Sequence, residues 1–390
     1  MDMTKLRAWW WHRQGLDGAL GGATPAEVLS RTGWARSVGG VNPYLTLFAR
    51  AGVHRGTVDA AVEALEIYEL PSARGCTYVL PAEHFALGLQ LGRGAAEVPL
   101  RTLARLGVER AEIERLCADV VTLLDGRTLD PAKLKAELGE AVRTLGEEGR
   151  KRGQATTLPA ALGLLQAAGE IRRVPSGGRL DNQRYAYTRW SVPPTGLDDA
   201  AARAELARLY FHWTGAATLA HFRWFSAFTV AAAKAAVAGL DLVDLGDGLL
   251  APADLAAEYA AFAPPPTPRY ALLAGIDALL LLRRDVPSLL DAPDAECPIP
   301  GAPDRRMGMV PDLPDHPIVD RGRVIGLWQY DVAAEEVVWW LFGGATPERD
   351  LAATIARTGV YIRDELGDAR SFSLDSPQSR APRIAALRAG

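Results

Sequence analysis

The chain has 390 residues, 48% of them hydrophobic, and a net charge of −4, so it can bury a large core in two or three modules and is too acidic overall for a nucleic-acid coat protein. Its cysteines, Cys76, Cys117 and Cys297, form no CxxC pair, which argues against a disulfide framework or a cysteine zinc site and favours a reducing, cytoplasmic setting. The first residues hold no apolar signal core, and no apolar run is long enough to span a bilayer.

Residues 1–108 form a first expected module, in which helices precede a hairpin. Thr24 followed by Pro25 is a good helix start, because threonine caps a helix and proline suits its first turn. The expected helices are Lys5–Gln14, Pro25–Thr32, Tyr44–Ala51 and Arg55–Leu65, and the expected strands are Ile67–Leu70 and Thr77–Leu80. This is the element order of a winged helix.

A second module, residues 109–190, ends in a hairpin rich in arginine. The periodicity predicts a helix over Ala111–Leu124, the stretch GEEGRKRG at 146–153 predicts a loop or hinge, and leucines at helical spacing follow from Leu158. Strands Glu170–Val174 and Arg184–Tyr187 then flank the turn PSGG. A helix of this kind can enter a DNA groove, and the wing after it can touch the backbone.

The same region, residues 150–190, contains eight basic residues and two acidic ones. Local basic charge in a mildly acidic chain favours a built binding face, so we expect phosphate contacts here. The residues assigned to DNA binding are Arg152, Arg172, Arg173, Arg179 and Arg184. The alternative is a solvated charged face without a partner.

A third module, residues 200–263, lies between a linker at 191–199 and a proline-rich tract at 263–268. Its expected helices are Ala201–Trp213, Thr218–Phe225 and Thr229–Ala238, and a short wing could follow at 242–251. In residues 269–390 we expect strands Ile318–Val319, Arg323–Tyr330 and Val337–Phe342, a helix over Ala345–Leu366, and a loose polar tail from Ser371. The predicted fold class is therefore α+β, mainly helical, with tandem winged-helix modules and a small C-terminal β element.

Five segments, in matching order, resemble the AlkZ/YcaQ-like family of winged-helix DNA glycosylases. They are LRAWWWHRQGLDG (6–18), YVLPAEHF (78–85), TGAATLAHFRWFSAFTVAAAKAAVAGL (214–240), LLAGIDALLLLRRDV (272–286) and DRGRVIGLWQYD (320–331). The catalytic signature of the family, Gln-apolar-Gln or Gln-apolar-Asp, is absent: its place falls on Arg36 and Val38, or on Gly39 and Val41. The resemblance implies a DNA glycosylase of a divergent branch, whose catalytic residues cannot be copied from the family.

A DNA glycosylase needs a pocket for the everted base, a group that stabilises an oxocarbenium-like sugar, and an oriented water. The segment at 35–44, ARSVGGVNPY, suits the rim of such a pocket, because its glycines allow close backbone approach. As catalytic residues there we expect Asn42, which could orient water or read a base edge, and Tyr44, which could stack on a base. Arg36 and Ser37 are assigned to substrate binding. The alternative is a turn in which Asn42 caps the next helix.

Two further places complete the expected site. Trp10 and His12 could reach the base from the first helix, whereas the other tryptophans are expected in the core. Asp277 lies between apolar stretches and is expected as an electrostatic stabiliser, or else as a structural ion pair with Arg283 or Arg284. The same two arginines are expected at the DNA.

These features predict a monofunctional DNA glycosylase that hydrolyses the N-glycosidic bond of alkylated or otherwise damaged bases. No lysine stands out as a Schiff-base nucleophile, and neither a metal site nor a cofactor is expected. The expected partner is double-stranded DNA with damaged bases, bound by a monomer in a bacterial cytoplasm, at the nucleoid, without a membrane. The alternative is a non-catalytic winged-helix DNA-binding protein or transcriptional regulator. Helical modules with no DNA role are a third reading, which the clustered arginines disfavour.

Overall fold

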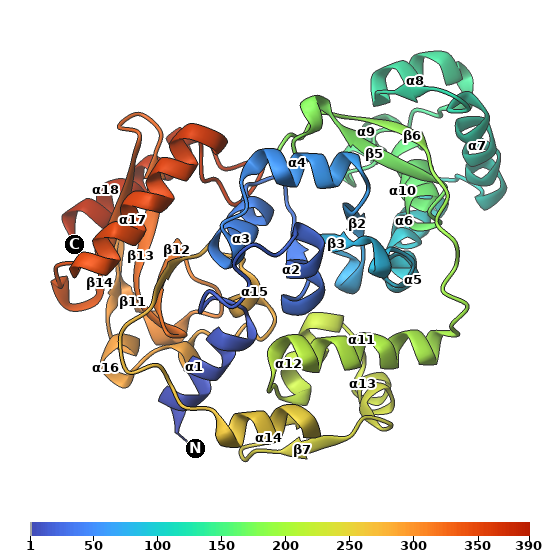
Figure 1. Cartoon of the computed structure of the whole chain (residues 1–390). Helices are drawn as coiled ribbons and strands as arrows, with labels where there is room; N and C mark the ends of the chain where they lie inside the picture. Colours follow the sequence, from blue (N-terminus) through green and yellow to red (C-terminus); the bar gives the residue numbers. More distant parts are fainter. Residues whose placement is uncertain (1) are drawn as a thin grey trace.

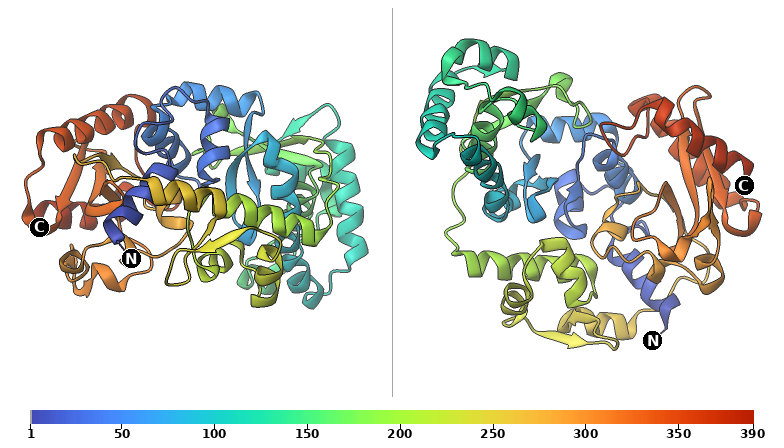
Figure 2. Two further views of the ribbon diagram at one scale, coloured as in Figure 1. Left: turned by 60° about the horizontal axis from the view of Figure 1, so that its bottom comes forward. Right: turned by 180° about the vertical axis from the view of Figure 1, so that it is seen from behind.

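The computed structural model describes residues 2–390, which fold as a mainly helical α+β protein, as the sequence predicted. Figure 1 shows the N-terminal helices in the middle of the molecule, with residues 109–190 at one end and the C-terminal sheet at the other. An extended linker joins β6 to α11 along the outer edge, which Figure 2 shows from behind. Within residues 2–390, no helix is long and apolar enough to cross a membrane.

The first part follows the predicted order of helices and hairpin, with the predicted bounds confirmed to within three residues. Its elements are α1 (Met3–Arg13), α2 (Pro25–Thr32), β1 (Ala35–Arg36), α3 (Asn42–Ala51), α4 (Arg55–Glu63), β2 (Ile67–Pro71), β3 (Thr77–Pro81), α5 (Phe85–Ala96) and α6 (Val98–Arg105). Helix α2 begins at Thr24 because that hydroxyl accepts from the Glu27 N–H while the Glu27 carboxylate accepts from Thr24 in return. The strand β1, which the sequence did not reveal, pairs antiparallel with β3.

The part of the chain between residues 110 and 189 contributes most of a separate buried cluster, to which Leu103 and Val108 also belong. Its elements are α7 (Arg110–Leu123), β4 (Thr128–Leu129), α8 (Pro131–Leu138), α9 (Gly146–Lys151), α10 (Leu158–Ala167), β5 (Ile171–Pro175) and β6 (Tyr185–Arg189). The predicted loop at 146–153 is wrong over most of its length, because α9 occupies it. Pairs one helical turn apart, Lys151 with Glu147 at 3.0 Å and Arg152 with Glu148 at 2.8 Å, support this short helix despite its glycines.

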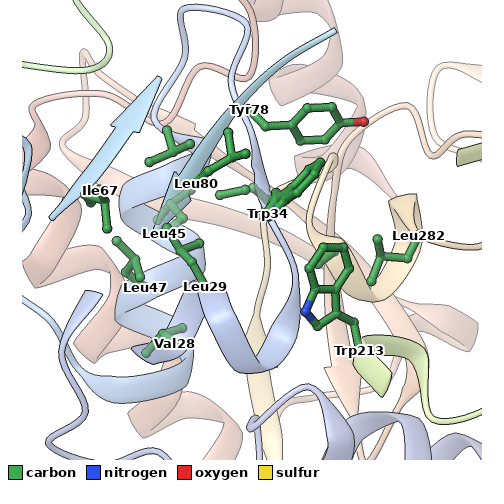
Figure 3. Close-up of a cluster of buried hydrophobic side chains, with 14 of the residues drawn as sticks. Val28, Leu29, Trp34, Leu45, Leu47, Ile67, Tyr78, Leu80, Trp213 and Leu282 are labelled. Atoms are coloured by element: carbon green, nitrogen blue, oxygen red, sulfur yellow. The ribbon is translucent and has the colours of Figure 1, made fainter. Parts of the chain in front are cut away.

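The middle of the chain continues the core of the N-terminal part. Its elements are α11 (Asp199–Thr214), α12 (Leu219–Ser226), α13 (Val230–Val237), β7 (Leu242–Asp244), β8 (Leu250–Pro252) and α14 (Ala253–Ala261). Figure 3 shows Trp34 between Tyr78 and Trp213 of α11, with Leu282 of the C-terminal part beside Trp213. The indole rings of Trp34 and Trp213 lie 5.3 Å apart between centroids. These parts therefore share one buried cluster. The four-way domain division drawn from the sequence, and the winged-helix assignment of each unit, stay predictions.

The C-terminal part is built on an antiparallel sheet in the order β14-β13-β12-β9. Its elements are β9 (Tyr270–Leu272), α15 (Ala278–Leu281), α16 (Ala292–Ala295), β10 (Pro298–Ile299), β11 (Ala302–Arg306), β12 (His316–Asp320), β13 (Arg323–Asp331), β14 (Glu336–Leu341), α17 (Arg349–Tyr361), the π-helical turn η8 (Ile362–Leu366) and α18 (Pro377–Ala389).

The prediction of a loose tail from Ser371 is wrong, because the chain ends in helix α18. A capping box between Ser376 and Ser379 starts this helix, and Pro377 occupies its first turn. The helix packs on β13 and β14, and its buried Arg380 donates to Asp368 at 2.6 Å. The tail is therefore held by tertiary contacts that its polar composition hides.

Candidate active site

The structure buries two of the three residues predicted to be catalytic beneath the glycine-rich turn. The Asn42 amide donates to the Arg36 carbonyl at 2.6 Å and closes the turn before α3. The Tyr44 hydroxyl donates to Asp59 at 2.6 Å and accepts from the Leu180 N–H at 2.9 Å. Burial, together with the neighbouring Asp59, raises the pKa of Tyr44. Asn42 thus holds the turn itself, whereas Tyr44 fastens α3 to α4 and to the arginine hairpin, and neither residue lines a cavity described below.

Asp277, the third predicted catalytic residue, lies in a buried ion pair with Arg50. Two guanidinium nitrogens of Arg50 donate to its carboxylate at 2.8 Å each, and both side chains are fully buried. The carboxylate also caps α15, and Gln14 accepts from Arg50 at 2.8 Å. The expected partners Arg283 and Arg284 are therefore wrong. The network joins three segments, around Gln14, Arg50 and Asp277, and holds α1, α3 and α15 together.

The arginines predicted to bind DNA differ in their burial and in whether they already have partners within the protein. Arg283 is buried, donates to the Thr214 and Ala216 carbonyls and stacks on Trp10 at 4.0 Å. Arg284 is paired with Asp312 at 2.5 Å.

Four of the predicted arginines around the hairpin already contact other side chains of the protein. The pairs are Arg152 with Glu148, Arg172 with Tyr68, Arg173 with Glu69, and Arg179 with Asp181. Arg184, directly before β6, is exposed and makes no ion pair with any other residue in the 2–390 range. Of the predicted set, Arg184 is therefore the one best placed to meet a phosphate.

The main cavity of the site has a volume of about 400 Å³ and lies where the N-terminal part, α12 and the C-terminal part meet. Pairing of β1 with β3 sets Arg36 opposite Tyr78, and both reach the cavity. The residues that line it are Arg36, Val38, Arg74, Cys76, Tyr78, Trp224, Gly275, Ile276, Leu281, Asp312, Leu313, Pro314, Asp315, Gln329, Ser371, Phe372, Asp375 and Arg383. Arg36 and Val38, one of the two placements of the missing family signature, thus lie in the wall of a cavity.

Two aromatic rings in the wall each face a guanidinium. Arg74 lies over the Trp224 ring at 4.3 Å, and Arg36 lies over the Tyr78 ring at 5.3 Å. The indole Nε1 of Trp224 is buried without a hydrogen-bond partner among residues 2–390. Trp224 was expected in the core, because its helix has an apolar sequence.

A buried carboxylate and a buried amide also border the cavity. Gln329 on β13 donates through Nε2 to Asp315 Oδ1 at 2.7 Å, whereas its Oε1 has no partner within residues 2–390. The Asp315 side chain is 2% exposed, and Gln329 is equally buried. Burial raises the pKa of Asp315, against the opposing effects of the Gln329 hydrogen bond and of Arg383, 3.7 Å away. Neither residue was predicted at the site, although the acidic run PDLPD at 311–315 was an available signal for Asp315.

A second cavity of about 230 Å³ adjoins the first and reaches the arginine hairpin. Arg36, Val38 and Cys76 line both cavities. Gly39, with a φ of 76°, lies so close to Gln183 of the hairpin that a Cβ at this position would collide with it. The glycine-rich turn and the hairpin are therefore neighbours, as a joint binding face requires.

Of the remaining residues predicted to bind substrate, Ser37 lines the second cavity, whereas Trp10 and His12 line neither of these two cavities. Ser37, in the wall of the second cavity, donates to Glu69 at 2.5 Å. Trp10 is buried and donates to the Ala216 carbonyl at 3.1 Å. His12 pairs with Asp17 at 2.6 Å and lines a separate cavity between α1, α2 and α11. The structure thus brings Arg36 and Ser37 to the candidate site, but not Trp10 or His12.

A match to a family model identifies the class of protein to which the chain belongs. Residues 39–360 match the family model described as DNA glycosylase AlkZ-like, so the chain belongs to that family and is a DNA glycosylase, an enzyme of DNA repair. This confirms the resemblance found in the sequence.

Among solved structures, the chain is similar to the Streptomyces sahachiroi DNA glycosylase AlkZ, with a TM-score of 0.69 and 20% sequence identity. The similarity covers 94% of this chain and 97% of that one, and it shows a shared fold. No curated protein matches the sequence.

Proposed function

We propose that this DNA glycosylase excises alkylated purines, or similarly damaged bases, by hydrolysing the N-glycosidic bond of a base everted into the main cavity. The observation that carries the proposal is the cavity itself. Its volume of about 400 Å³ falls in the range of about 300–1,000 Å³ typical of ligand sites, and it combines aromatic faces with buried polar groups. A flipped base is read by such groups and by stacking.

The chemistry of the wall supports a base that leaves easily. An alkylated purine carries positive charge, so its C1′–N bond breaks without prior protonation of the base. Tyr78 and Trp224 place aromatic rings in the wall, on which a planar base can stack. Three carboxylates, Asp312, Asp315 and Asp375, border the cavity and favour the charged sugar of the transition state.

The proposal includes water as the nucleophile and duplex DNA as the bound partner. Within residues 2–390, no lysine lines the main cavity, so the chain offers no Schiff-base nucleophile there and we propose a monofunctional enzyme. The second cavity leads from the base site to the hairpin that carries Arg184, which would contact the phosphate backbone. We further propose that one copy of the chain suffices, because the proposed base site is built from a single chain.

The test is an excision assay on duplex oligonucleotides that contain 7-methylguanine, 3-methyladenine or hypoxanthine, with an undamaged duplex as substrate control. We expect strand breaks at the lesion only after alkali, since a lyase would break the strand without it. Trp224→Ala should abolish excision, whereas Trp339→Ala, a matched change on β14 outside the cavity, should not. Tight binding of every duplex without any base release would instead support the non-catalytic DNA-binding protein.

A further inference from the structure

We propose that Asp315 is the catalytic carboxylate of this enzyme: with Gln329, it seats the attacking water and takes up its proton. The inference rests on the proposed function, because it assigns a role within the same hydrolysis. It concerns the contact between the segment before β12 and strand β13, which borders the main cavity.

Among the groups that line the cavity, few can accept a proton from water. The guanidinium groups of Arg36, Arg74 and Arg383 stay protonated and offer no acceptor. The carboxylate of Asp312 is half-exposed and is engaged by Arg284 through both oxygens, at distances of 2.5 to 3.1 Å. Asp375, 22% exposed, accepts from the Phe372 N–H in a surface turn. Asp315 is the buried carboxylate of the set.

The free acceptor atoms around Asp315 fit one water molecule. The Gln329 amide donates to Oδ1 of Asp315, so the amide oxygen Oε1 and the second carboxylate oxygen remain to accept from other donors. A buried acceptor without a hydrogen-bond partner is unfavourable, so Oε1 requires a donor. A water that donates one O–H to Gln329 Oε1 and the other to Asp315 Oδ2 satisfies both acceptors. Its lone pair then remains free for the sugar carbon.

The electrostatic setting of Asp315 suits a base that works near neutral pH. Burial raises its pKa, and a carboxylate with a raised pKa binds the water proton more strongly while staying ionised above that pKa. Arg383 of α18 and Gln329 of β13 oppose this rise, whereas Asp375, in the turn before α18, adds to it.

The other charged groups near Asp315 are Asp312 on its own segment and Arg36 and Arg74 across the cavity. The neighbouring His316 side chain is engaged instead by the Gly275 N–H and the Ala369 carbonyl. These groups, with Arg383, Gln329 and Asp375, set the charge state on which the pH profile depends.

The step balances with water as the sole co-reactant. The C1′–N bond breaks and the base leaves with its electron pair, which neutralises the positive charge of an alkylated purine. A lone pair of the water oxygen forms the new C1′–O bond, and the water proton passes to Asp315 Oδ2 and then to solvent. While the C1′–N bond breaks and before the C1′–O bond is complete, the carboxylate faces the positive charge that develops on the sugar.

The experiment is single-turnover excision of 7-methylguanine from a duplex by the full chain. Asp315→Asn should lower the rate by about 100-fold or more, as loss of a general base does, with unchanged affinity for undamaged duplex. Asp315→Glu should retain part of the activity. The matched control is Asp294→Asn, because burial also raises the pKa of Asp294, it has an arginine 3.4 Å away, and it lies outside the cavity. That variant should excise at the wild-type rate.

A second variant keeps the inference testable if Asp315→Asn does not fold. Gln329→Met removes both the hydrogen bond that lowers the pKa of Asp315 and the second water acceptor. Its rate should fall about 10-fold, and the acid side of its pH–rate profile should move to higher pH than in the wild type. Wild-type rates in Asp315→Asn, or an unmoved acid side in Gln329→Met, would overturn the role of Asp315. Failure of the wild type to release any base would instead refute the proposed function.

Discussion

Mild acid should destabilise this protein through His316, a buried imidazole beside the candidate site. The ring stacks on Trp328 with centroids 4.5 Å apart. Its Nδ1 accepts from the Gly275 N–H at 2.9 Å, and its Nε2 contacts the Ala369 carbonyl at 2.8 Å. This pattern suits the neutral ring with the proton on Nε2. A second proton, on Nδ1, would face the N–H of Gly275 and break that hydrogen bond, so the charged ring does not fit this site.

The size of the effect follows from the pKa of the ring. Burial, chiefly, lowers the pKa of His316 from 6.5 to about 4. Above pH 6.5 the ring is neutral in both the folded and the unfolded chain and has no effect. As the pH falls below 6.5, the unfolded chain takes up a proton that the folded chain refuses until about pH 4. The free energy of unfolding therefore drops by about 2 kcal/mol at pH 5 and by about 3 kcal/mol below pH 4.

The assay is urea unfolding at pH 7 and pH 5, followed by tryptophan fluorescence, for the wild type and for His316→Asn. Asparagine can still accept from Gly275, but it does not titrate. His221 also has its pKa lowered to about 4 and acts in the same window, so the comparison with the variant isolates His316. We expect the stability difference between the two proteins to shrink by about 2 kcal/mol at pH 5. An equal difference at both pH values would refute the reasoning.

Two further predictions concern the buried ion pair and the hairpin. Asp277→Asn leaves the Arg50 charge buried without its partner, so the free energy of unfolding should fall by about 3–5 kcal/mol in urea titrations, and the double variant Arg50→Met/Asp277→Asn should recover part of the loss. A change below about 1 kcal/mol would contradict the network. Arg184→Ala should weaken binding to damaged and undamaged duplex alike and reduce the salt slope by about 1, measured by fluorescence anisotropy at several salt concentrations. Arg388→Ala, on α18 and paired with Glu336, serves as the control, and an equal loss in both variants would count against a phosphate contact.

Local sequence signals determined most of the elements. Thr24 and Pro25 marked the start of α2 correctly, because a capping box and a proline act within one helical turn. Alternating apolar residues located the hairpins of β2 with β3 and of β5 with β6. The same signals failed for α9, whose glycines hid a helix supported by side-chain pairs, and for α18, whose polar sequence hid a face that packs on the sheet.

The candidate site could be predicted only in part. Arg36 and Val38, in the segment before α3, line a cavity, and the hairpin that the sequence marked by its arginines lies beside it. Asn42 and Tyr44, chosen for their chemistry, are instead buried and hold the turn in place. Chemistry by residue type does not tell which side of a turn faces a cavity, because that is set by what packs behind it.

The sequence by itself thus determined the family, the helices and hairpins, and the basic hairpin, because each depends on residues a few positions apart. The tertiary structure alone decided the partner of Asp277, which is Arg50, 227 positions away, and the contact of Asp315 with Gln329. Burial and the pKa of a side chain depend on the segments that fold over it, and the main cavity draws its wall from residues between Arg36 and Arg383. No local pattern along the chain encodes which of these segments will meet.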